Sequence, residues 1–261
     1  MGAIGEKYDK TTDTLDVRDF DVVARVLEDR IRDICRAVGA TQEPLLFLTG
    51  DAKLLGGEYR PNFREAVAVG KVYKGTRKGN KPYHYRNLTA YIIATYNTVI
   101  ANGMEADDLI GMEQYERREK GDTIICTRDK DLRMVPGLHY GWECGKQGEV
   151  GPLAYDDFGE IRLVRSKSGN KIVGGGVKFF FAQLLTGDTV DNIGGLRRVG
   201  PVKAFDILTE CGDEQACRDA IKDVYEGTYG EGYMELLEEQ SKLLWIVRER
   251  DANGDLVHYQ W

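Results

Sequence analysis

Four short segments of the sequence carry acidic residues at spacings that suit metal-dependent chemistry. TGD ends at Asp51 after a short apolar run, and TRDKD places Asp129 and Asp131 two residues apart after another. In extended chain such a pair points to one side of the backbone, and ligands of parallel sheets bind outside the carboxyl ends of strands. MEADD and TGDTVD are the other two segments. The candidate metal ligands are Asp51, Glu105, Asp107, Asp108, Asp129, Asp131, Asp188 and Asp191.

Carboxylates that gather in one cleft need positive charge beside them. Two carboxylates about 4 Å apart repel by roughly 4 kcal/mol at an effective dielectric near 20. Sites made only of oxygen ligands favour Mg²⁺ or Mn²⁺. Two such ions suit phosphodiester hydrolysis, in which one activates water for in-line attack and the other stabilises the leaving 3′ oxygen.

A purely structural interpretation differs in strength between the segments. Acids in the first turn of a helix complement its dipole, so Glu105 and Asp108 taken alone are better explained as helix capping. Asp188 and Asp191 are expected three residues apart at the end of an apolar helix, where an acid is unfavourable with the dipole. Convergence of all four segments on one cleft favours a functional interpretation.

The charge distribution indicates a polyanionic partner. The chain of 261 residues has a net charge of −7, yet residues 66–104 and 161–187 contain no acid and several Lys and Arg. Separate acidic and basic segments suit a metal-dependent enzyme acting on a polyanion, with chance segregation of solvated faces as the alternative. The five cysteines form no CxxC pair and the three histidines are far apart, which argues against a zinc ribbon or a His-dependent triad.

Phosphate-binding residues are predicted in two places. The basic loop KVYKGTRKGNKPYHY covers residues 71–85. GGLRRVGPVKAF places glycines before a helix that starts at Pro201, with Lys203 in its first turn. Backbone N–H groups at such a helix start bind phosphate, which would offset the unfavourable position of Lys203. The predicted DNA-binding residues are Lys71, Lys78, Lys81, Arg197, Arg198, Gly200 and Lys203.

Hydrophobic patterns predict strands alternating with helices, and hence a parallel sheet covered on both faces. Strands are expected near residues 45–49, 123–127 and 138–142, with a hairpin over 159–176, and a short apolar stretch covers residues 98–101. Helices are expected near residues 17–39, 87–97 and 104–120, and the C-terminal third is expected to be mostly helical. No apolar run is long enough to span a bilayer, and the polar N-terminus does not read as a signal peptide, so we expect a cytoplasmic protein without membrane contact.

With these residues in place, the chain resembles the 5′-nuclease (flap endonuclease) family, and among its members the short bacteriophage 5′–3′ exonucleases. The resemblance covers about residues 45–208 and rests on TGD, FREAVAVGKVYKGTRKGNKP, MEADD, TRDKD and TGDTVDNIGGLRRVGPVKA, in that order. Each motif alone is modest, whereas their combination is highly specific.

The resemblance implies an α/β, PIN-like fold with a mostly parallel central sheet flanked by helices. It implies a catalytic region over residues 1–186 and a helix–three-turn–helix DNA-binding region over 187–261, packed as one continuous unit. It further implies two Mg²⁺ or Mn²⁺ ions on the eight acids, a K⁺ ion at the helix–three-turn–helix loop, and a DNA partner bound by a monomer in a phage-infected or bacterial cytoplasm. Catalytic roles at the scissile phosphate and terminal base fall to Lys74, Arg77 and Tyr73, although simple packing is an equal alternative for Tyr73.

Two departures from the family pattern bear on activity. The family opens with a strand that carries a metal-binding Asp, whereas residues 1–18 contain no such strand and Asp16 in TLDV is a poor substitute. We expect either that the given chain is truncated or that this member lacks that ligand. Only about 30 residues separate Lys74 from Glu105, which favours 5′-end processing over the threading of long flaps.

The sequence leaves three functions to compare. The main hypothesis is a Mg²⁺-dependent 5′–3′ exonuclease with some structure-specific endonuclease activity, serving primer removal in DNA replication or breakdown of host DNA. A second is a DNA-structure-binding protein with impaired catalysis. The third is a sugar-nucleotide transferase that uses DKD as its metal motif, which leaves Asp188, Asp191 and the glycine-rich helix start unexplained.

Overall fold

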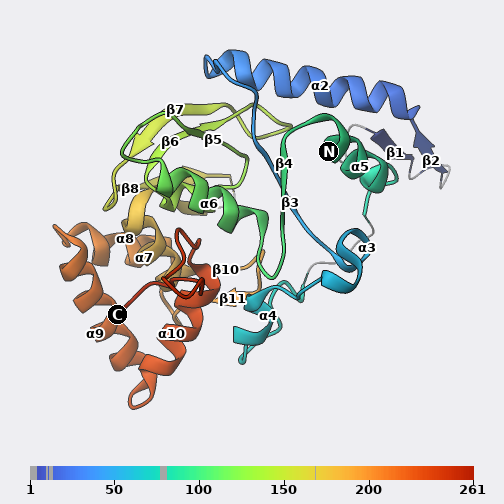
Figure 1. Cartoon of the computed structure of the whole chain (residues 1–261). Coiled ribbons are helices and arrows are strands. Elements are labelled where there is room, and N and C mark those ends of the chain that lie inside the picture. Colours follow the sequence, from blue (N-terminus) through green and yellow to red (C-terminus); the bar gives the residue numbers. More distant parts are fainter. Residues whose placement is uncertain (1–4, 10, 12–13, 77–80, 168) are drawn as a thin grey trace. The chain divides into compact units, whose positions relative to one another are not determined.

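A computed structural model of the chain describes residues 5–9, 11, 14–76, 81–167 and 169–261. Contacts divide the chain into two compact units (Figure 1). Unit 1 is formed by Met1–Leu48 and Lys78–Ile100, and unit 2 by Thr49–Arg77 and Ala101–Trp261. The boundary expected between residues 186 and 187 falls inside unit 2, and that division of the chain stays a prediction.

Among its described residues, unit 1 contains helices α2 and α5, the short antiparallel pair β1–β2 and most of β3 and β4. Helix α2 (Phe20–Ala37) confirms the helix expected near residues 17–39, and α5 (Tyr85–Thr95) confirms the one near 87–97. Strands β1 (Glu6–Asp9) and β2 (Thr14–Val17) pair antiparallel, with Asp16 opposite Lys7. The sequence predicted no strand here because the segment is short and polar. β2 is exposed along most of its length, so it is not the buried strand with which the 5′-nuclease family opens.

Strands β3 (Leu46–Thr49) and β4 (Thr98–Ala101) pair with each other and lead into the acidic segments. The Leu46 N–H donates to Asn97 O and the Gly50 N–H to Ala101 O, both at 2.9 Å. These bonds advance in the same direction along both segments, which is the parallel arrangement. The chain leaves β3 towards Asp51 and leaves β4 towards Glu105, so both acids follow the carboxyl ends of neighbouring strands. The sequence predicted this position for Asp51 but not for Glu105.

The remaining strands belong to unit 2. β5 pairs parallel with β6, β6 pairs antiparallel with β7, and β8–β9 and β10–β11 are antiparallel pairs. Short connections favour antiparallel neighbours, which explains why parallel pairing is limited to β3–β4 and β5–β6 among the described residues. The strand β7 was not predicted. Their bounds are Ile124–Cys126 (β5), Gly137–Gly141 (β6), Val150–Tyr155 (β7), Ile161–Ser166 (β8), Gly169–Gly174 (β9), Gly187–Asp188 (β10) and Ile193–Gly194 (β11).

Helix α7 forms the centre of the core of unit 2. Phe180, Phe181, Leu184 and Leu185 are fully buried, and α8, α9 and α10 pack against this helix. A helix that is apolar on every side is stable only when other elements surround it. The C-terminal helices gather beside it (Figure 1). The helices of unit 2 are α3 (Ala52–Leu55), α4 (Phe63–Val67), α6 (Ala106–Glu116), α7 (Gly176–Thr186), α8 (Pro201–Thr209), α9 (Glu214–Tyr229) and α10 (Tyr233–Leu244), with 3-10 turns η1 (Gly56–Glu58) and η2 (Asp131–Met134).

The α/β class is confirmed, and the mostly helical C-terminal third is confirmed as well. Pro201 is the first residue of α8, with Gly200 at its N-cap, as the sequence predicted. Within the described part of the chain, no helix is long and apolar enough to cross a membrane.

Candidate metal centre

Three segments of unit 2 meet around the ammonium group of Lys74. Its Nζ forms an ion pair with Glu105 and lies 3.8 Å from Asp191 Oδ2. The Tyr73 hydroxyl donates to the same two acids, at 3.0 Å to Glu105 Oε2 and 3.2 Å to Asp191 Oδ2. The Lys74 backbone N–H donates to Asp191 O at 2.9 Å. Lys74, predicted as a catalytic cation at the scissile phosphate, and Asp191, predicted as a metal ligand in a distant motif, therefore lie side by side.

Tyr73 occupies a structural position within this group. Its side chain is buried in the hydrophobic core, and burial together with the charges of Glu105 and Asp191 raises the pKa of its hydroxyl despite the opposing effect of Arg64. The hydroxyl therefore stays protonated and orients two carboxylates. Its ring has no exposed face for a nucleic-acid base in this arrangement.

A second lysine joins two further predicted ligands. Lys130 Nζ lies 2.6 Å from Asp131 Oδ1 and 3.0 Å from Asp188 Oδ2, and Gln183 also donates to Asp131. Burial lowers the pKa of Lys130, but Asp131 and Asp188 outweigh burial and raise it, so this lysine stays charged. Burial tends to raise the pKa of Asp188, yet Lys130 and two backbone N–H groups bring it below its usual value.

The DKD and TGDTVD segments differ locally from the predicted geometry. Asp131 starts the turn η2, and its backbone N–H donates to Asp129 Oδ1 at 3.0 Å, so the two acids are not an extended i,i+2 pair. Asp188 lies in β10 and Asp191 in the following turn, not at the end of α7. Asp188 Oδ1 accepts the Val190 N–H at 2.8 Å.

Asp107 lies where negative charge is least compensated. Burial raises its pKa to about 7, and the charges of Asp129, Glu105 and Asp108 add to the shift, while Lys74 opposes it. Within the described residues, no hydrogen bond or ion pair reaches its carboxylate. A cation beside Asp107 would relieve this repulsion.

In EDTA, this carboxyl should make folding pH-dependent. A raised folded-state pKa contributes stability below the unfolded value of 3.8, and that stability is lost as pH rises through about 7. The Asp107→Asn variant is the reference, because its amide stays neutral. Relative to this variant, the unsubstituted chain should lose up to about 4 kcal/mol of its free energy of unfolding between about pH 4 and pH 7. Urea titrations across this range measure the difference; parallel profiles would contradict the assignment.

Asp108 differs from the other acids because it is buried and both of its carboxylate oxygens accept hydrogen bonds. The residue is 0% exposed and pairs with Arg64, itself 2% exposed, through hydrogen bonds of 2.7 and 2.8 Å. The same carboxylate accepts the backbone N–H of Glu105 at 3.1 Å and that of Val247 at 3.1 Å. Arg64 also donates to the carbonyls of Leu243 and Trp245. Asp108 thus fixes the start of α6, consistent with the capping interpretation.

Asp51 serves locally as the N-cap of α3. Its Oδ1 accepts the backbone N–H groups of Lys53 and Leu54, both at 3.1 Å. The Ala106 N–H donates to Thr49 Oγ1 at 3.0 Å, which ties the end of β3 to the start of α6. These bonds hold the TGD and MEADD segments together.

The basic residues occupy several places. Lys71 is exposed and lies near Gly194, and Arg197, Arg198, Gly200 and Lys203 are exposed around the start of α8. Lys81 belongs to unit 1, where its Nζ lies 4.3 Å from the centre of the Tyr85 ring. Arg77 and Lys78 lie outside the described residues. Sequence reasoning missed Gln183 and Arg64, each of which holds one of the predicted acids.

The acids fit a divalent ion in chemical type and charge. They offer only carboxylate oxygens, and Asp107 lies among like charges. Among the described residues, however, no group of three or more His, Cys, Asp or Glu side chains is arranged to hold a metal ion. Lys74 and Lys130 supply the positive charge between the carboxylates instead.

Known proteins similar to this chain include a DNA polymerase and three solved structures. No family model matches the chain. The chain is 30% identical over 115 residues, 42% of its length, to DNA polymerase I of Rhizobium leguminosarum, and the match spans 10% of that protein.

Solved structures similar to this chain come from bacteriophage T5. The T5 D15 protein co-crystallised with metal ions is 13% identical, with a TM-score of 0.49, covering 85% of this chain and 84% of that one. A complex of T5 D15 flap endonuclease with DNA and metal ions is 11% identical, with a TM-score of 0.47, covering 85% and 90%. T5 5′-exonuclease with bound zinc is 12% identical, with a TM-score of 0.44, covering 85% and 90%.

Proposed function

We propose that this protein is a divalent-metal-dependent 5′-nuclease that hydrolyses phosphodiester bonds at the 5′ ends of DNA. The observation that carries the proposal is the gathering of acids from separate segments around Lys74 and Lys130, with Asp107 left short of positive charge. The relatives support it, since they include a flap endonuclease bound to DNA and metal ions and a 5′-exonuclease.

The proposed ion ligands are the four acids paired with the two lysines, together with Asp107 and Asp129, whose charges interact. In such a site divalent ions supply activation of water for in-line attack and stabilisation of the leaving 3′ oxygen. Ion binding requires the ammonium groups of Lys74 and Lys130 to turn from the carboxylates, which their flexible stems permit. Asp51 follows the end of β3, and Asp108 has a positioning role. The proposed ligands are Glu105, Asp107, Asp129, Asp131, Asp188 and Asp191.

The chain's own cations then have two tasks. With a phosphate between the carboxylates, Lys74 can move its Nζ from Glu105 to a phosphate oxygen and stabilise developing negative charge. The exposed residues at the start of α8, Arg197, Arg198, Gly200 and Lys203, are proposed to bind the DNA backbone as part of a helix–three-turn–helix element, where a K⁺ ion can bind. We propose that a monomer binds the DNA.

One observation favours a second candidate, a DNA-structure-binding protein without cleavage. The lysines occupy the gaps between the acids, and no group of three acids is arranged to hold an ion in the described part of the chain. Such a protein would bind branched or ended DNA equally well with Mg²⁺ and with EDTA.

An assay on one duplex, labelled at the 5′ end or the 3′ end in parallel reactions, distinguishes the candidates. With Mg²⁺ the 5′ label should leave as mononucleotides or short oligonucleotides, while the 3′-labelled strand shortens gradually. EDTA should abolish both changes. A 5′-flap substrate in the same assay compares endonuclease with exonuclease activity. Binding without cleavage in Mg²⁺ would favour the second candidate.

A further inference from the structure

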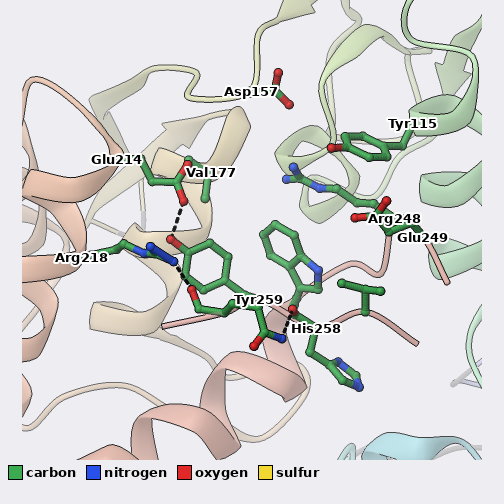
Figure 2. Close-up of a pocket in the computed structure, with 12 residues that line it drawn as sticks. Tyr115, Asp157, Val177, Glu214, Arg218, Arg248, Glu249, His258 and Tyr259 are labelled. Carbon is green, nitrogen blue, oxygen red and sulfur yellow. Dashed lines mark hydrogen bonds between the residues drawn. The ribbon is translucent and has the colours of Figure 1, made fainter. Parts of the chain in front are cut away.

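Unit 2 contains a cavity that none of the predicted acids or basic residues lines. Its volume is about 360 Å³, within the range of small-molecule sites. Its walls come from α6, the connection between β7 and β8, the start of α7, α9 and the C-terminal segment after α10 (Figure 2). The residues that carry the argument are Tyr115, Asp157, Arg218, Trp245, Arg248 and Glu249.

Arg248 is a buried cation that forms no ion pair with any carboxylate of the described residues. The residue is 8% exposed, and its Nε has no hydrogen-bond partner. One Nη donates to Met134 O, and the guanidinium lies 4.1 Å from the centre of the Trp245 ring and 5.8 Å from that of Tyr115. Burial lowers the pKa of Arg248 to about 10. Figure 2 shows the side chain extending into the cavity between these walls.

The contrast with Arg64 indicates what is missing. Arg64 is buried to a similar degree, but it has Asp108 as a bidentate partner and its pKa is raised. Buried arginines are normally paired, because an unpaired buried charge is costly. A second orphaned donor, Nε of Arg218, belongs to the same cavity wall. An oxyanion would satisfy the donors that the protein leaves open.

The rest of the wall restricts the kind of anion. Asp157 and Glu249 are exposed and line the same cavity, so a compact polyanion would meet like charge there. The Glu214 carboxylate is already occupied, since it accepts the Tyr259 hydroxyl at 2.6 Å. Carboxylates at the rim accept hydrogen bonds from amines, and the aromatic walls suit a flat ring. The ligand therefore combines an oxyanion with a flat, amine-bearing ring.

We propose that this cavity binds a nucleoside monophosphate, with its phosphate on Arg248 and its base against Trp245 and Tyr115. This class joins the three features in one small molecule. The proposal is independent of catalysis, because it uses no residue of the metal centre.

Isothermal titration of the full chain with adenosine 5′-monophosphate tests the proposal. The titration is done in EDTA, which removes metal-dependent binding at the acids. We expect saturable binding of one nucleotide per chain, with at least tenfold weaker binding of both adenosine and inorganic phosphate. Absence of saturable binding would overturn the proposal, and so would equal affinity for inorganic phosphate, since the ring would then contribute nothing.

Variants locate the site. Arg248→Met should weaken nucleotide binding at least tenfold, and Arg218→Met, at a half-buried position less critical for folding, should weaken it several-fold. Arg250→Met is the matched control, because Arg250 is exposed in the same segment and donates to Gly254 O. Unfolding in urea checks that each variant is folded. Unchanged affinity in folded Arg248→Met and Arg218→Met would contradict the assignment, whatever the nuclease assay shows.

Discussion

Replacing Lys74 by Met should lower the rate constant for DNA cleavage by about 10²–10³-fold, the range typical for loss of one preorganised electrostatic group. The Lys74 ammonium is held between Glu105 and Asp191 in a partly buried site, where charge is screened less than in water. Met keeps the length of the side chain and removes only the charge. Single-turnover cleavage of a 5′-labelled duplex in Mg²⁺ measures the effect. The control is Lys120→Met, because Lys120 is exposed in the turns that follow α6.

The backbone at Lys74 allows a sharper form of this experiment. Lys74 has φ of 54°, in the left-handed region that disfavours residues with a side chain, at a cost of about 1–3 kcal/mol. Lys74→Gly should relieve this strain and still abolish the charge. We therefore expect the variant to lose activity as Lys74→Met does without being less stable. Cleavage by either variant at the rate of the unsubstituted chain would contradict the role of Lys74.

Replacing Arg64 by Met should reduce the free energy of unfolding by about 3–5 kcal/mol, because it leaves the buried carboxylate of Asp108 without its partner. The pair is almost inaccessible to solvent, with side chains 2% and 0% exposed. Arg64 also satisfies two backbone carbonyls, so its loss leaves further buried groups unpaired. Urea denaturation at pH 7 measures the change.

A double substitution separates the ion pair from general packing. Arg64→Met with Asp108→Leu removes both charges and should recover a large part of the loss, since an apolar pair of similar volume is often neutral. Arg165→Met, on an exposed strand, should change stability by less than about 0.5 kcal/mol. A loss below about 1 kcal/mol in Arg64→Met would mean that Asp108 has another source of compensation.

Local patterns accounted for most elements of the fold. The run FFFAQLL predicted the buried helix α7, and the run before TRDKD predicted β5, because burial of apolar side chains is visible in any window of sequence. The strands β1, β2 and β7 were not predicted. β1 and β2 are short and polar, and β7 contains glycine and proline. Such strands depend on their pairing partners more than on their own composition.

The site was predictable in its residue types but not in its internal connections. The sequence singled out Lys74, Glu105 and Asp191, but nothing local indicates that one ammonium group joins them, since Tyr73 and Asp191 are 118 positions apart. The same holds for Arg64, which lies 44 positions from Asp108. The available signal for Arg248 was its position directly after the apolar run LLWIV. Long-range pairs of this kind are decided by the packed fold.

The measurement that tests the central claim most directly compares Mg²⁺-dependent release of 5′-labelled nucleotides by the unsubstituted chain and by Asp129→Asn. Asp129 contributes to the negative charge around Asp107. Asp219→Asn, an exposed acid of α9, is the matched control. We predict cleavage by the unsubstituted chain and by Asp219→Asn in Mg²⁺, none in EDTA, and little by Asp129→Asn although it still binds DNA. Cleavage that persists in EDTA, or that Asp129→Asn retains in full, would contradict a metal centre built from these acids.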